Sequence, residues 1–97
     1  MPVDRKLNDR VTRATFALDK AHSALSRAEE AIADVTTPTS TEGNFARRGA
    51  LRAAVDSRQD DRARMLADRF LAEDGVDEAL RKELLDILHS RCPHCGE

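Results

Sequence analysis

Apolar residues in the first third of the chain recur with a heptad spacing, and this repeat is the strongest constraint on the fold. From Leu7 to Val35 they are separated by alternating steps of four and three residues, the pattern of one continuous helical stripe. One set of positions carries large side chains: Val11, Leu18, Leu25 and Ile32. The other set is mainly alanine: Leu7, Ala14, Ala21, Ala28 and Val35. Because small residues give a neighbouring helix room to approach, we predict a long helix over residues 1–35 that needs a partner along this seam.

The partner of this seam is open at the level of sequence. Short connections favour antiparallel neighbours, which indicates a second helix of the same chain, and an intermolecular coiled coil is the alternative. Residues 36–44 predict the connecting loop, because Pro38 and Gly43 interrupt helical periodicity and Asn44 can cap the following helix.

The segment 45–74 predicts a second helix with an interrupted apolar stripe. Residues 56–62 contain no apolar side chain, although the stripe is present on both sides of them. Ser57 followed three residues later by Asp60 is a capping signal. The helix therefore either continues with a shift of phase or breaks near 57–60.

A last helix is predicted over 77–90. Asp74 and Gly75 form a stop signal before it, and Asp77 can cap its first turn. The predicted fold class is all-α, with a single domain over residues 1–97. It consists of a long, coiled-coil-like antiparallel helical hairpin, a third, C-terminal helix packed on it, and a short zinc-knuckle tail over 91–97.

Both cysteines lie in the tail Cys92-Pro93-His94-Cys95-Gly96. Two thiolates separated by two residues in a tight turn form half of a tetrahedral zinc site. The stretch is similar to the knuckle of zinc-ribbon proteins, although the second knuckle of that family is missing here. A cysteine pair that follows a helix, rather than opening one, does not fit the thioredoxin-like redox motif.

Histidines are the candidates for the remaining zinc ligands. If the last helix runs parallel to the first, His89 comes level with His22, which predicts a structural zinc site of His22, His89, Cys92 and Cys95. His94 could replace His89, and a site shared by two copies of the chain is a further alternative. His22 can also be an ordinary flank residue that makes a hydrogen bond.

Composition limits the possible functions. The chain has 97 residues, three Phe, no Trp or Tyr and a formal charge of −2, so it can form one thin helical core and has no bulk attraction for polyanions. No stretch approaches the roughly 18 apolar residues of a membrane span, and no N-terminal segment is typical of a secretory signal. We expect a cytoplasmic protein that does not enter a membrane.

No catalytic constellation or phosphate-binding loop stands out, so we expect no enzymatic activity. Arg47, Arg48 and Arg52 form the main basic patch and are the predicted partner-binding residues. The sequence favours a small helical protein–protein interaction module, such as an adaptor, inhibitor or regulatory subunit, stapled by zinc. Proteins of this kind are common among phage and mobile-element accessory genes. A homodimer is open, and the alternative is a nucleic-acid-binding or transcription-regulatory protein that uses the arginine patch.

Overall fold

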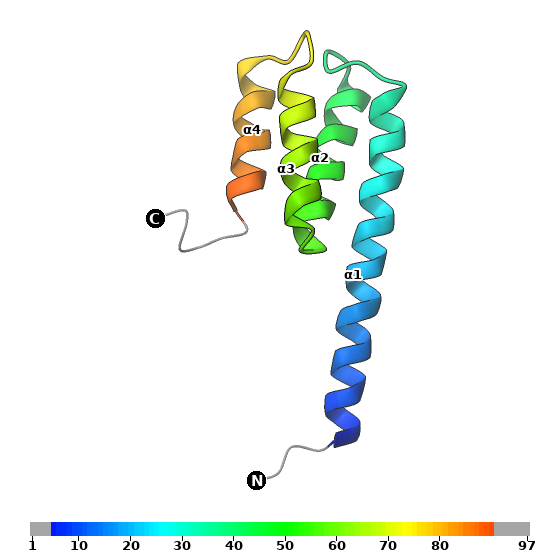
Figure 1. Ribbon diagram of the computed structural model, residues 1–97. Coiled ribbons are helices and arrows are strands. Elements are labelled where there is room, and N and C mark those ends of the chain that lie inside the picture. The colour runs from blue at the N-terminus through cyan, green and yellow to red at the C-terminus, as the bar shows by residue number, and fades with distance from the viewer. Residues whose placement is uncertain (1–4, 91–97) are drawn as a thin grey trace.

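The computed structural model describes residues 5–90, with side chains from residue 9 onward, and this part of the chain is helical without any strand (Figure 1). The all-α prediction is confirmed. The chain forms four helices: α1 (Arg5–Asp34), α2 (Thr41–Asp56), α3 (Asp60–Leu71) and α4 (Glu78–His89). None of these helices is long and apolar enough to cross a membrane.

Helices α2, α3 and α4 form a body, and α1 joins this body through its second half only (Figure 1). The first half of α1 projects past the end of the body, which gives the molecule an elongated shape of 56 × 32 × 20 Å. The long helix expected from the heptad repeat is therefore present, but the other described helices do not extend along its first half.

The turn between α2 and α3 resolves the interrupted pattern of the segment 45–74. Arg58 has a φ of 61°, the left-handed conformation that usually follows the end of a helix. Its N–H donates to the Val55 carbonyl and the Gln59 N–H donates to the Ala54 carbonyl, both at 3.0 Å, which is a Schellman motif. The chain therefore breaks at 57–59, and α3 folds back along α2.

This break changes the direction of the last helix. Because α3 returns to the end of the body where α1 finishes, α4 runs antiparallel to α1 and lies at the opposite edge of the molecule (Figure 1). The parallel course that the sequence analysis assigned to the last helix is wrong. The start of α2 also differs from the prediction, because Ser40, and not Asn44, caps it by accepting a hydrogen bond of 2.9 Å from the Gly43 N–H.

The apolar core lies within the body. Leu51 of α2, Leu66 and Phe70 of α3, and Leu84 of α4 are completely buried and pack together with alanines of α2 and α3. Each such side chain stabilises the fold by about 1.5–3 kcal/mol relative to an exposed position. From the described part of α1, only Ala33 joins this core cluster.

Candidate interaction surface

Helix α1 docks on the body through polar contacts. Ser26 is fully buried, and its hydroxyl donates to the Ala50 carbonyl at 2.7 Å and accepts from Arg62 Nε at 3.1 Å. Arg62 Nη2 also donates to Glu30 at 2.7 Å, and Arg69 Nη1 donates to the same carboxylate at 2.6 Å. Helix α1 is therefore held on the body by a hydroxyl and by charged side chains. A helix that packs on a core ordinarily makes this contact with apolar side chains such as leucine.

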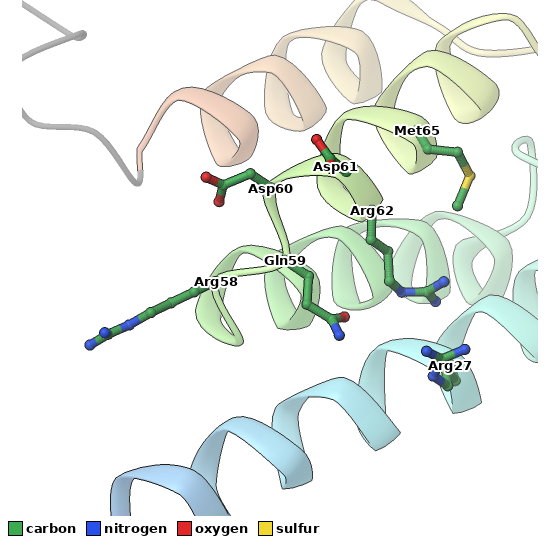
Figure 2. A pocket seen from close by; sticks show the side chains of 7 residues that line it. All are labelled: Arg27, Arg58, Gln59, Asp60, Asp61, Arg62 and Met65. Atoms are coloured by element: carbon green, nitrogen blue, oxygen red, sulfur yellow. The ribbon is translucent and has the colours of Figure 1, made fainter. Parts of the chain in front are cut away.

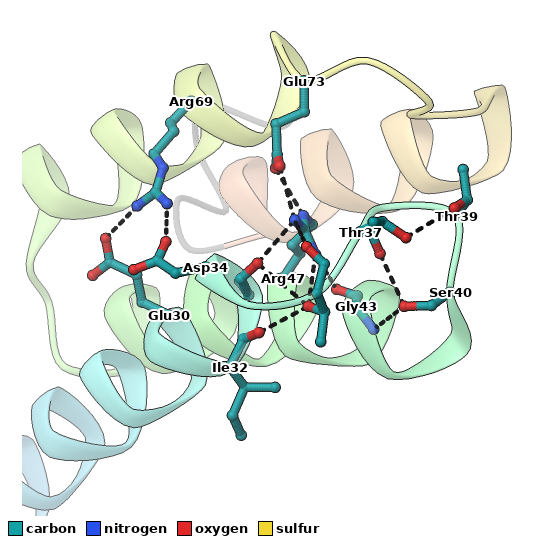
Figure 3. Close-up of polar contacts among 12 residues, drawn as sticks. Glu30, Ile32, Asp34, Thr37, Thr39, Ser40, Gly43, Arg47, Arg69 and Glu73 are labelled. Atoms are coloured by element: carbon teal, nitrogen blue, oxygen red, sulfur yellow. Dashed lines mark hydrogen bonds and ion pairs between the residues drawn. The ribbon is translucent and has the colours of Figure 1, made fainter.

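Arg69 strengthens this docking at the end of α1. It pairs with both Glu30 and Asp34, so one guanidinium joins two successive turns of α1 to α3 (Figure 3). The hydrogen bond to Asp34 raises the pKa of Arg69 despite an opposing effect of burial, and the charges of Asp34, Glu30 and Glu73 raise it further. Arg69 thus stays protonated, and the pairing persists wherever the two carboxylates are ionised.

The heptad seam faces solvent on another side of α1. The exposed fraction is 56% for Val11, 57% for Leu18, 48% for Leu25 and 45% for Ile32. The intervening Ala14, Ala21 and Ala28 are exposed as well. We call these seven residues the α1 stripe. No described part of the chain covers the stripe, so the predicted intrachain partner of the seam is not confirmed, although α1 packs against α2 on the side that carries Ser26.

Phe45 of α2 extends the α1 stripe sideways. Its side chain is 66% exposed and lines two shallow grooves of about 350 and 420 Å³, one shared with Ile32 and the other with Leu25. Gly49 lines the second groove, where a Cβ would lie 3.0 Å from Oε2 of the Glu29 side chain. Nothing in the sequence points to this role of Phe45 beyond its place at the start of the second helix.

Arg47 lies inside the molecule and does not belong to the surface that the sequence predicts from three arginines (Figure 3). It is 1% exposed, and it donates to the Glu73 carboxylate from Nε at 2.7 Å and from Nη2 at 2.8 Å. It also donates to the carbonyls of Ala33, Thr36 and Gly43 at 2.9–3.1 Å. Its charge is thus paired and its donors are used, which makes Arg47 a clamp between α1, α2 and the end of α3.

The position of Arg47 could have been found from its register. It lies three residues before Ala50 and four before Leu51, so it occupies the buried face of α2. Arg48, the next residue, is half-buried and pairs with Glu83 of α4 at 2.7 Å, while Arg52 is exposed. The predicted basic surface is therefore reduced to Arg48 and Arg52.

The structure separates the two predicted histidine ligands. His22 is half-buried on α1 and His89 is exposed at the end of α4, and these helices lie at opposite edges of the molecule without direct contact in the described residues (Figure 1). Cys92, Cys95 and the alternative ligand His94 lie outside the described residues. Within the described part, no three His, Cys, Asp or Glu side chains form a group that could hold a metal. The zinc site stays a prediction.

A polar cleft of about 660 Å³ lies where α1 passes the turn between α2 and α3 (Figure 2). It is lined by Arg27, Arg58, Gln59, Asp60, Asp61, Arg62 and Met65. Arg62 is already bound by Ser26 and Glu30, and Arg58 points away from Arg27 and Arg62 (Figure 2). Since its charges are mixed and do not converge, the cleft indicates no ligand, and the α1 stripe is the better candidate for a functional surface.

Comparisons of the chain with protein-family models, with curated proteins and with solved structures give no match.

Proposed function

We propose that this protein is a small, non-enzymatic protein–protein interaction module and that the α1 stripe, together with Phe45, is its binding surface. The observation that carries this proposal is the exposure of Val11, Leu18, Leu25 and Ile32 along one line of one helix. A contiguous apolar surface of this kind typically marks a site of association.

The docking of α1 supports this function. An amphipathic helix whose only task is to complete a core turns its apolar face inward. Helix α1 instead presents Ser26 and Glu30 to the body and Leu18 and Leu25 to solvent. The polar docking leaves the apolar face free for another helix, which would bind through side chains spaced three and four residues apart.

An adaptor, an inhibitor or a regulatory subunit would each use such a surface.

A structural zinc held by Cys92 and Cys95 remains part of the proposal, as a staple of the C-terminal tail. Zinc analysis of protein purified without added metal tests it, with His22→Ala and His89→Ala as paired variants. Because α1 and α4 do not contact each other in the described residues, we expect His22→Ala to leave the zinc content unchanged.

The binding function is tested with a matched pair of variants. Leu18→Asp places a charge in the middle of the α1 stripe, while Phe16→Asp places the same charge two residues away, on a side chain that is 66% exposed and outside the stripe. Proteins retained by the immobilised wild type are identified by mass spectrometry, purified and titrated against all three chains. We expect Leu18→Asp to weaken binding at least about tenfold and Phe16→Asp to leave it unchanged. Equal binding by both variants would contradict the proposal.

A further inference from the structure

The α1 stripe has features that identify its partner. Resting on the proposed function, we infer that the stripe binds the α1 helix of a second copy of this chain, and that the two helices lie antiparallel with their midpoints together. The protein is then a symmetric dimer in which the projecting half of each α1 covers the docked half of the other.

The length of the stripe is sufficient for such a dimer. Helix α1 has 30 residues and is therefore about 45 Å long, and its seam covers about four heptads, the length that coiled coils need. A contact strip about 10 Å wide on each of the two helices gives on the order of 900 Å² of buried surface, close to the roughly 1,000 Å² of a specific interface. Phe45, at the edge of the stripe, adds to this area.

The order of large and small residues selects the antiparallel arrangement. When two copies of α1 overlap completely, the twofold axis passes between Asp19 and Lys20, at the middle of the helix. The facing pairs are then Val11 with Ala28, Ala14 with Leu25, and Leu18 with Ala21. Each of these three layers joins one large and one small side chain, so the central layers have a similar thickness, and only the outermost pair, Leu7 with Ile32, joins two large residues.

A parallel dimer in register lacks this match. Each position would face its own copy, so Leu18 would meet Leu18 and Ala21 would meet Ala21. Layers of two large residues would then alternate with layers of two small ones. Such a helix pair either overpacks at the first kind of layer or leaves voids at the second.

The helix dipoles favour the same arrangement, because they oppose each other in an antiparallel pair of helices and reinforce each other in a parallel pair.

The body leaves room for the second helix. Helices α2 and α3 contact the side of α1 that carries Ser26 and Glu30, and the α1 stripe is open to solvent. The first half of the second α1 would lie along Leu25 and Ile32, with Phe45 as a side wall. The grooves on both sides of Phe45 are therefore part of the same interface.

The molecular mass in solution tests the dimer. Sedimentation equilibrium of the full chain from about 1 to 100 µM compares the wild type with Leu18→Asp and Phe16→Asp. We expect a dimeric wild type, an at least about 100-fold weaker dimer for Leu18→Asp, which alters both symmetry-related sites, and an unchanged Phe16→Asp. Circular dichroism should show the same helical content for all three monomers, because Leu18 contributes nothing to the core.

A wild type that stays monomeric over this range overturns the dimer, and so does a dimer that persists in Leu18→Asp. Neither result removes the proposed binding function, which fails only if no protein of any kind binds through the α1 stripe. Capture of a different protein by a monomeric wild type would therefore keep the function and replace the second copy as the partner.

Spin-label distances test the orientation. In a Cys92→Ser, Cys95→Ser background that retains the wild-type mass, single labels are placed at Asp9→Cys and at Phe16→Cys, both exposed and outside the stripe. In the antiparallel dimer the two labels at residue 9 are separated by about 32 Å along the axis and the two labels at residue 16 by about 10 Å. A parallel dimer gives no axial separation at either site, so equal distances at residues 9 and 16 overturn the inferred orientation.

Discussion

The body and α1 use the same kinds of side chains in opposite ways. The body buries Leu51, Leu66 and Phe70 and leaves most of its charges on the surface, as globular domains do. Helix α1 exposes Leu18 and Leu25 and directs Ser26 and Glu30 toward the body. The comparison shows that an apolar pattern in a sequence identifies a surface that must be covered, and does not identify what covers it.

The clamp at Arg47 is where the two regions depend on each other most. Arg47→Ala leaves the Glu73 carboxylate without its guanidinium partner and removes a donor from the carbonyls of Ala33, Thr36 and Gly43, so we expect the free energy of unfolding to fall by about 3–5 kcal/mol. Arg52→Ala, at an exposed position on the same helix, should change it by less than about 0.5 kcal/mol. Urea unfolding at concentrations where the chain is monomeric measures both, and equal effects would show that the clamp does not hold α1 to the body.

The contrast between buried and exposed leucines is sharpened by one pair of substitutions. Leu66→Ala creates a cavity in the body and should cost about 2–5 kcal/mol. Leu25→Ala removes the same atoms from a side chain that is 48% exposed and should cost less than about 1 kcal/mol in the monomer. The two free energies are compared in a Leu18→Asp background, which keeps association out of the measurement. A large cost for Leu25→Ala would mean that the α1 stripe is part of the monomer core.

Two glycines of α2 test how closely α1 and its loop approach the body. A Cβ on Gly43 would lie 1.8 Å from the Thr37 carbonyl oxygen, so Gly43→Ala must move backbone and should cost about 1–3 kcal/mol. A Cβ on Gly49 would meet only the flexible end of Glu29, so Gly49→Ala should be neutral or slightly stabilising. Thermal unfolding followed by circular dichroism ranks the two, and the reverse order would contradict this account of the loop.

The apolar periodicity and the helix-end signals of the sequence were sufficient to predict individual helices. The heptad repeat predicted a long α1, and the signals at Asp74, Gly75 and Asp77 predicted the start of α4. The arrangement of the helices stayed open, because the sequence could not decide whether the second helix breaks near 57–60, and the turn there uses Arg58 in a conformation that usually requires glycine. Arg47 was wrongly assigned to the surface. A charged residue is expected at the surface unless its partner is known, and the partner of Arg47, Glu73, is 26 residues away in the sequence.

The turn at Arg58 folds α3 back along α2 and so forms the body as a unit distinct from α1. Substitutions there should change the free energy of unfolding least, but they test the difference between the two regions directly. Left-handed backbone costs a residue with a side chain about 1 kcal/mol that glycine does not lose, and Arg58 is exposed. We therefore expect Arg58→Gly to raise unfolding free energy by about 0.5–1 kcal/mol, measured from the urea midpoint. Arg64→Gly, at an exposed position inside α3, should lower it by about 1 kcal/mol. If Arg58→Gly instead destabilises the protein as Arg64→Gly does, residues 56–62 are helical in solution, and α2 and α3 form one rod beside α1.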